Sequence, residues 1–197
     1  MVAEFALDPD TALMLKVREG DGPSFDQLLT RHRSGVVNHL YRLVNNNRDI
    51  AEELAQDVFI RVYRSRTRYQ PDAKFTTWLF RITTNVALNW RRDTRREAAH
   101  LRLDDEIRNA HKRELWDRAP RADEVLVLQH RAKQIRAAIQ MLPAKQLAAV
   151  LLHKYEGLEY SEIAEVLDCT IPALKSLLFR AYEKLRQRLA HFGPEAA

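Results

Sequence analysis

The sequence predicts an all-α fold made of two small helical domains joined by a flexible linker. Hydrophobic residues make up 46% of the chain, enough for globular cores, and only 5 of its 197 residues are glycine. Apolar residues recur every three or four positions, and no run alternates apolar and polar residues as a strand does. One charged stretch in the middle has sparse apolar spacing, so it divides the helices into two groups.

Charge and composition narrow the class of protein. The chain has 32 basic and 27 acidic residues, a net charge of +5 that favours a polyanionic partner. Its single cysteine, Cys169, excludes an intrachain disulfide and suits a reducing compartment. The N-terminus lacks a signal-peptide pattern, and the longest aliphatic run, 147–152, is far shorter than the roughly 20 residues of a membrane span. We therefore expect a cytoplasmic protein without membrane insertion.

The first two predicted helices follow a short N-terminal tail, residues 1–9. Apolar spacing begins near Asp10 and continues to Leu43, interrupted by the turn sequence from Gly20 to Pro23. We expect these two amphipathic helices to be scaffold.

The third predicted helix begins near Asp49, where Asp49 and Glu52 have the spacing of a capping box. Its apolar residues recur at helical spacing and leave the opposite face polar. The polar residues of that face form an acidic stripe: Asp49, Glu52, Glu53, Gln56 and Asp57.

The sign of the charge reverses at Arg61. Several arginines lead into a loop from Tyr69 to Phe75 that contains Pro71 and is bounded by aromatic residues. A threonine, Thr76 or Thr77, is expected to cap the helix that follows.

The fourth predicted helix has two unlike faces. One face is apolar and suits a core: Phe75, Leu79, Ile82, Val86 and Trp90. The other combines an aromatic with amides and guanidinium groups: Trp78, Arg81, Asn85, Asn89 and Arg92. Asn reads base edges, Arg binds phosphates, and aromatic rings stack on bases or wedge between them, so this face favours nucleic acid. The helix is expected to end in the arginine cluster 91–96.

Residues 97–122 have the pattern of a linker, with one possible short helix over 107–116. Beyond it, apolar spacing predicts helices over 125–142, 146–155 and 161–167, with Pro143 and Gly157 as breaks. A three-residue turn and Pro172 then introduce a long final helix. A short helix, a tight turn and a longer helix are typical of a helix-turn-helix, and DNA-binding examples place the second helix in the major groove.

The final helix has an apolar face from Ile171 to Leu189 and a polar face that permits docking in the major groove. The candidate DNA contacts lie at its N-terminal half: Thr170, Lys175, Ser176, Phe179 and Arg180.

Two stretches carry a family resemblance. The segment AEELAQDVFIRVYRSRTRYQPDAKFTTWLFRITTNVALNWRR, residues 51–92, resembles region 2 of the extracytoplasmic-function (group IV) RNA polymerase sigma factors of the sigma-70 superfamily. The motif LP-x-x-Q at 142–146, followed by YEGLEYSEIAEVL at 155–167, resembles region 4 of the same factors. The family usually has Gly where Asp168 stands, and Asp tolerates the left-handed backbone region that such a turn needs.

The resemblance implies a domain map and a mechanism. Region 2 would span 10–96 and region 4 would span 123–191, with a C-terminal tail at 192–197. The acidic stripe would dock on core RNA polymerase, and the loop from Tyr69 to Phe75 would hold a base flipped out of the -10 element. The implied -10 contacts are Tyr69, Lys74, Phe75, Trp78, Arg81, Asn85, Asn89 and Arg92, and the implied -35 contacts are those of the final helix. An anti-sigma factor is a further implied partner.

Other functions fit the residues less well. The 7 histidines show no metal spacing and there is no Gly-rich phosphate loop, so we expect neither a catalytic site nor a cofactor. A stand-alone helix-turn-helix regulator would leave the acidic stripe and the Trp78 face unexplained. An RNA-binding or purely interaction protein is a third alternative, and binding to core polymerase separates all three.

Overall fold

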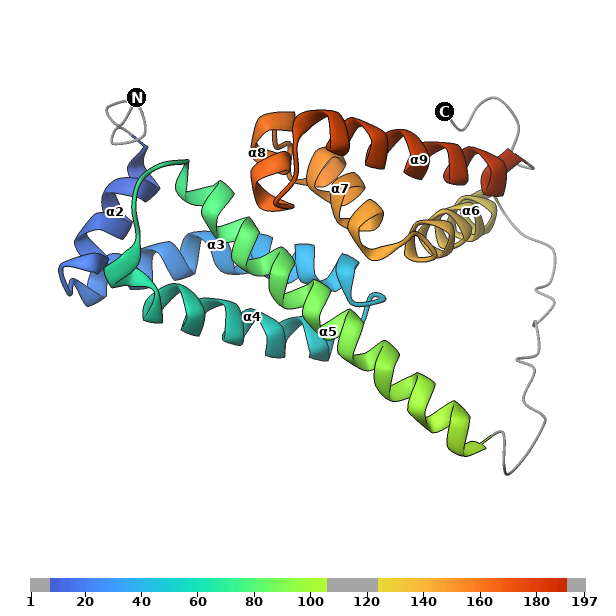
Figure 1. Cartoon of the computed structure of the whole chain (residues 1–197), viewed down its shortest axis with the longest axis horizontal. Helices are drawn as coiled ribbons and strands as arrows, with labels where there is room; N and C mark the ends of the chain where they lie inside the picture. The colour runs from blue at the N-terminus through green and yellow to red at the C-terminus, as the bar shows by residue number, and fades with distance from the viewer. Residues whose placement is uncertain (1–7, 106–123, 191–197) are drawn as a thin grey trace.

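The computed structural model describes residues 8–105 and 124–190, and within these ranges it is helical and contains no strand (Figure 1). The predicted all-α class is therefore confirmed. The first half consists of α2 (Pro9–Arg18), α3 (Gly22–Leu43), α4 (Arg48–Arg64), the 3-10 turn η1 (Arg66–Arg68) and α5 (Phe75–Asp105). The second half consists of α6 (Glu124–Gln140), α7 (Ala144–Tyr155), α8 (Tyr160–Val166) and α9 (Ile171–Leu189).

The start of α4 differs from the prediction. Asn47, not Asp49, is the N-cap, and its side chain accepts a hydrogen bond from the backbone N of Ile50 at 3.1 Å. Asn45 and Asn46 precede it with φ values of +57° and +58°. Asn adopts this left-handed region more readily than most residues, so the two asparagines make the turn that delivers Asn47 to the cap position.

Helix α5 is longer at both ends than the sequence predicted. It begins at Phe75, and the backbone N of Trp78 already donates to the carbonyl of Lys74, so Thr76 and Thr77 lie inside its first turn rather than capping it. The predicted end at 91–96 is also wrong, because the helix continues to Asp105 over about 46 Å. No Gly or Pro interrupts it. The predicted short helix at 107–116 lies outside the described residues.

The helix-turn-helix forms as predicted. Helix α8 is capped by Glu159, whose side chain accepts from the backbone of Glu162 while the Glu162 carboxylate accepts from the backbone N of Glu159 at 2.8 Å. Asp168 has a φ of +49°, which confirms the expected left-handed turn. The Thr170 side chain accepts from the backbone N of Ala173 at 3.3 Å and caps α9, with Pro172 in the first turn.

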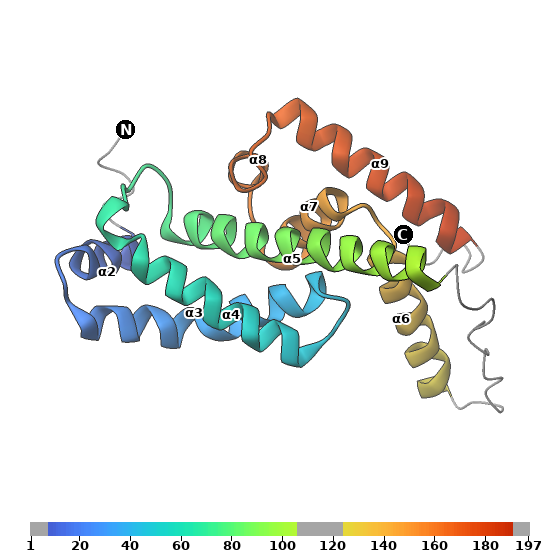
Figure 2. The same cartoon turned by 60° about the horizontal axis from the view of Figure 1, so that its bottom comes forward.

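The two halves pack against each other along α5. Figures 1 and 2 both show α4 and α8 on opposite sides of α5, and α3 and α5 both contact α7. Apart from Ala138, the buried apolar residues of both halves belong to one continuous cluster. The sequence predicted two domains but not this contact between them.

The glycine that ends α7 gives a stability prediction. Gly157 has a φ of +64°, and a methyl group added there would meet no other described atom within 4 Å, so Gly157→Ala changes only backbone strain. We expect the substitution to lower the free energy of unfolding by about 1 kcal/mol. Gly35→Ala is the control, because Gly35 lies inside α3 with equal free space and should gain up to about 1 kcal/mol. Urea unfolding of both variants measures the change in the free energy of unfolding. An equal change in the two variants would contradict the prediction.

Candidate functional site

Helix α5 carries three faces rather than the two predicted. Its core face is buried, with Phe75 and Leu79 at 0% exposure and Val86 at 3%. A second face points to solvent and carries the predicted polar residues. A third, which the sequence did not reveal, meets the second half of the chain.

The solvent face of α5 has the chemistry of a nucleic-acid surface. Arg81, Asn85, Asn89 and Arg92 are all exposed and follow one another at intervals of four, four and three residues. This row is about 16 Å long, close to five nucleotides of a stacked strand. Among the described residues, Arg92 forms an ion pair only with its neighbour Asp93, and such exposed pairs are weak. The row is therefore available to a ligand.

Trp78 stands at the start of this row and is half-buried. Its ring lies 4.9 Å from the ring of Tyr69 in an edge-on arrangement and 5.9 Å from the ring of Phe75. Trp78 thus packs on the loop that precedes α5 and keeps part of its surface in solvent.

The structure corrects the prediction for two aromatic residues of the loop. The rings of Tyr69 and Phe75 are buried, with exposures of 2% and 0%, so they are not available to stack on a base in this conformation. Burial raises the pKa of the Tyr69 hydroxyl. Both residues are core residues that fix the loop in place.

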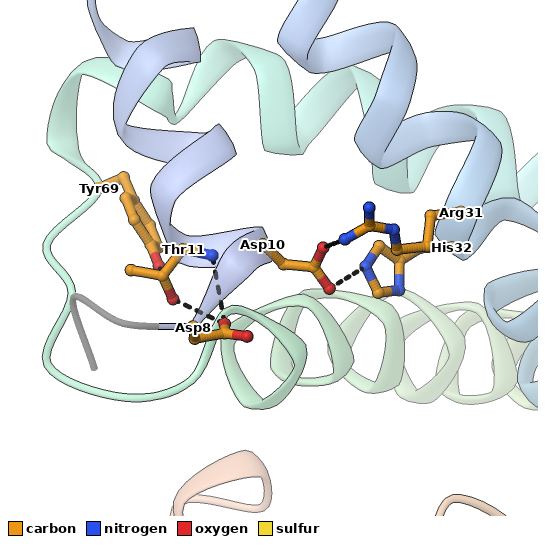
Figure 3. A network of polar contacts seen from close by, with 6 residues as sticks. All are labelled: Asp8, Asp10, Thr11, Arg31, His32 and Tyr69. Carbon is orange, nitrogen blue, oxygen red and sulfur yellow. Dashed lines mark hydrogen bonds and ion pairs between the residues drawn. The ribbon is translucent and has the colours of Figure 1, made fainter. Parts of the chain in front are cut away.

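A polar network fastens the start of this loop to α2 (Figure 3). The Tyr69 hydroxyl lies beside Thr11, whose hydroxyl donates to a carboxylate oxygen of Asp8 at 2.8 Å. Along the same helix, Asp10 forms an ion pair with Arg31 and a hydrogen bond with His32, both of α3. The network holds α2, α3 and the loop together. Because Trp78 packs on Tyr69 of this loop, the network also fixes the position of the Trp78 ring.

Helix α4, which carries the acidic stripe, lies on the side of the first half away from α7 to α9 (Figures 1 and 2). The residues of the stripe are exposed or partly exposed, while Ala51, Ala55 and Val58 on the opposite face are buried. The stripe therefore forms a surface that the fold leaves open.

Part of the charge of this stripe is already neutralised. Glu52 forms ion pairs with Arg33 at 2.6 Å and Arg48 at 2.9 Å, and Asp57 pairs with Arg61 at 2.8 Å. Glu53 is exposed and makes no ion pair within the described ranges. Glu53 is consequently the carboxylate most available to a basic partner.

The candidate DNA contacts on α9 lie together on its outer face. Lys175, Ser176, Phe179 and Arg180 are exposed and line one open depression, while Leu174 is buried beneath them. An apolar ring that is 70% exposed, as Phe179 is, indicates a partner surface more strongly than exposed charges do. Thr170 caps the helix and is also exposed. The predicted group is thus assembled at the N-terminal half of the helix.

Lys74 is placed differently from the other predicted contacts. Its ammonium nitrogen lies 3.0 Å from the Glu162 carboxylate of α8, and this hydrogen bond and charge attraction raise the pKa of Lys74. Lys74 therefore contacts the second half of the chain in this structure, not a free surface.

Sequence reasoning missed the residues along this contact, which we call the seam: His39, Arg42, Arg91, Gln140, Tyr155, Glu156 and Glu162. The only sequence signal was His39, a polar residue in the apolar register of α3. The others have the pattern of ordinary surface residues.

Comparison with known proteins identifies the family. Residues 28–97 match the family model Sigma-70 region 2, and residues 132–185 match Sigma-70, region 4. The chain is 30% identical over 199 residues to the RNA polymerase sigma-H factor of Pseudomonas aeruginosa, a match that covers 96% of this chain and 98% of that protein. The chain belongs to the RNA polymerase sigma-factor family. The predicted resemblance is therefore confirmed.

Two further matches place this sigma factor among its relatives. It is 36% identical over 179 residues to the ECF RNA polymerase sigma factor SigE of Mycolicibacterium smegmatis, covering 89% of this chain and 65% of that protein. The fold resembles the sigma factor RpoE solved in complex with the anti-sigma factor NepR from Bartonella quintana. That match has a TM-score of 0.61 and 22% identity, and covers 84% of this chain and 96% of the other.

Two kinds of feature are missing from the described part of this sigma factor. None of its helices there has the length and apolar character needed to span a membrane. Within the same ranges, no three His, Cys, Asp or Glu side chains gather as metal ligands would.

Proposed function

We propose that this sigma factor binds core RNA polymerase and directs it to promoters by recognising a -35 element and opening a -10 element. The observation that carries the proposal is the presence of three separate open surfaces on one chain: the acidic stripe of α4, the solvent face of α5 and the outer face of α9. A stand-alone regulator needs only the last of them. The proposed function is therefore one of binding and positioning, without catalysis by this chain.

The acidic stripe is proposed to dock on a basic surface of the polymerase. Glu53, Asp49 and Gln56 are exposed, and Asp57 and Glu52 can exchange their intramolecular arginine partners for polymerase ones. Exposed ion pairs contribute little to stability, so this exchange costs little. Charge complementarity of this kind gives specificity and a high association rate.

The solvent face of α5 is proposed to contact the -10 element. Asn85 and Asn89 supply amides for base edges, and Arg81 and Arg92 supply guanidinium groups for phosphates. Trp78 offers the exposed part of its ring to an unpaired base, and Tyr69 and Phe75 support Trp78 from below. The proposal thus replaces direct base contacts of Tyr69 and Phe75 with a structural role.

The outer face of α9 is proposed to read the -35 element in the major groove. We propose 10–96 and 123–191 as the limits of regions 2 and 4, and helix α5 extends past residue 96 into the segment between them. The relative RpoE was solved with an anti-sigma factor, and we propose such a regulator here as well. We propose that this sigma factor acts in the cytoplasm, where core polymerase transcribes.

Titration of fluorescently labelled chain with purified core polymerase, in the absence of DNA, tests the proposal. We expect saturable binding that weakens as salt is raised, because charged surfaces meet. A stand-alone regulator would instead bind duplex DNA and would not bind core polymerase. Failure to bind core under conditions where the chain is folded would refute the proposed function.

Arg180 gives a prediction about sequence preference. Its guanidinium Nε donates to the carbonyl of Ser176 at 3.1 Å, which leaves the terminal nitrogens of an exposed side chain free. Arg180→Ala should flatten base preference at one or two -35 positions by about 1–3 kcal/mol, because a base-reading Arg is worth that much. Competition binding of holoenzyme to single-base -35 variants measures it. Uniform weakening across all sequences would make Arg180 a phosphate contact instead.

A further inference from the structure

The seam between the two halves is built from polar side chains that the proposed function does not use. Its centre is Glu156 at the end of α7. One carboxylate oxygen of Glu156 lies 3.1 Å from Nδ1 of His39, which is fully buried in α3, and 3.5 Å from a guanidinium nitrogen of Arg42. The Arg42 guanidinium also stacks over the Tyr155 ring, 4.3 Å from its centroid. The Glu156 carboxylate of the second half thus bonds His39 and forms an ion pair with Arg42, both of the first half.

A second contact lies at the start of α5. Glu162 of α8 accepts from Lys74 at 3.0 Å and from the Thr77 hydroxyl at 3.5 Å. Glu162 also closes the capping box of its own helix. The Glu162 side chain is 16% exposed and that of Lys74 is 53% exposed, so the pair lies at the solvent edge of the contact. Lys74, one of the -10 contacts that the family resemblance implies, is bound to Glu162 for as long as the halves stay together.

A third contact joins α6 to the first half. The Gln140 amide donates to the Arg42 carbonyl at 2.5 Å, and Arg91 donates to the Gln140 side chain at 3.3 Å and to the Leu43 carbonyl at 2.6 Å. Burial and the nearby charge of Arg95 lower the pKa of Arg91. These three sets of contacts lie along α3 and α5 and fix the second half at several points.

This closed arrangement conflicts with simultaneous binding of both promoter elements. Lys74 touches Glu162, and Glu162 is connected to Lys175 of α9 through two helical segments and a short turn, a path of about 30 Å. With the side chains included, Lys74 and Lys175 lie within about 40 Å of each other. Elements centred at -10 and -35 are about 85 Å apart on straight B-form DNA. The closed chain reaches one element but not both.

We propose that Glu156 and Glu162 form an intramolecular latch that holds the free chain closed and must release before regions 2 and 4 engage a promoter together. The effect of the latch on promoter binding rests on the proposed function, whereas the latch itself is a property of the free chain. Opening exchanges the seam contacts for water and frees Lys74 for the -10 element. A chain that populates the open form only in part binds with an apparent affinity reduced by that fraction.

Charge reversal at the centre of the latch provides the test. Glu156→Arg places a cation against Arg42, and Glu162→Gln removes the charge facing Lys74 while Gln still completes the capping box. Small-angle X-ray scattering of the free chain should show a larger radius of gyration for the double variant than for the wild type. If closed molecules outnumber open ones by about ten to one, promoter-complex formation with core polymerase should rise by up to about tenfold at subsaturating chain.

Two matched variants separate the latch from a general effect of charge. Adding Arg42→Glu to Glu156→Arg reverses the pair and should restore most of the compact radius, as a double-mutant cycle requires for residues in contact. Glu165→Arg makes the same charge change on an exposed position of α8 and should leave radius and promoter binding unchanged. Circular dichroism shows whether each variant is folded. If the double variant is unfolded, the single variant Glu162→Gln replaces it as a milder test of the latch.

The outcomes decide between the alternatives. A wild-type chain that is already as extended as the double variant would overturn the latch. So would an enlarged radius without any gain in promoter-complex formation, because closure would then not compete with the promoter. If no variant forms a promoter complex with core polymerase, the proposed function fails, while the scattering of the free chain still shows whether the latch exists.

Discussion

Replacing Arg81 and Asn85 together with alanine is expected to reduce transcription from an intact duplex promoter by at least about tenfold. Unstacking base pairs costs a few kcal/mol per step, and a protein that melts DNA must recover that cost through contacts to the opened strand. Each lost contact is worth about 1–3 kcal/mol, and 1.4 kcal/mol is a factor of about ten. Both side chains are exposed on α5, so the fold should be unaffected.

The same variant should transcribe almost normally from a template already mismatched across the -10 region, because melting is then no longer needed. Lys16→Ala with Gln27→Ala, two exposed positions on α2 and α3, is the control and should be silent on both templates. Trp78→Ala is a poorer probe, since its ring also packs on Tyr69. Equal losses on the two templates would show that the solvent face of α5 acts in docking, not in melting.

Reversing the charge of Glu53 and Asp57 to Lys is expected to weaken binding to core polymerase by at least about thirtyfold. Removing one partner of a buried charge pair at an interface costs about 2–5 kcal/mol or more, and reversal adds repulsion. The fold should survive, because Glu53 is exposed and the Asp57–Arg61 pair is a surface pair spaced i, i+4. Fluorescence titration with core polymerase measures the loss.

Glu19→Lys with Asp26→Lys makes the same change in net charge on exposed positions of the first half and should bind core as the wild type does. Glu53→Gln with Asp57→Asn should lose less affinity than the reversal. Unchanged binding by the reversed stripe would mean that the acidic face of α4 is only solvated and that polymerase docks elsewhere.

The helices could be predicted from the sequence because each has an apolar stripe with a period near 3.6 residues. Their ends were harder to place, because a cap depends on backbone geometry that several neighbouring polar residues can supply. Asn47 is the N-cap of α4 although Asp49 had the capping-box spacing. The reason is that Asn45 and Asn46 adopt left-handed backbone conformations, which bring Asn47 to the cap position. Helix α5 ran on to Asp105 because high helix propensity outweighed the loss of apolar spacing.

The candidate surfaces could be predicted where they lie opposite a core stripe. The solvent face of α5, the stripe of α4 and the outer face of α9 all followed from this geometry. Tyr69 and Phe75 could not be placed correctly, because the order of residues in a loop does not show which of its rings fold inward. Their burial depends on the contact with Thr11 and Trp78, which only the tertiary structure brings together.

The seam could not be predicted at all, because it depends on how two separately patterned halves dock. Glu156 and Glu162 are ordinary residues in the helical pattern, and Glu162 already has a local role in the capping box. Their partners are far away in the sequence, at His39 and Lys74. No local period links such positions.

Transcription from a library of duplex templates with randomised upstream sequence, using core polymerase with and without this chain, tests the central claim most directly. A promoter-directing sigma factor should produce transcripts that start at defined positions. The selected templates should share two sequence blocks at constant spacing, near -35 and -10. Initiation that is no greater or more specific with the chain than without it, under conditions where the chain is folded, would contradict the account.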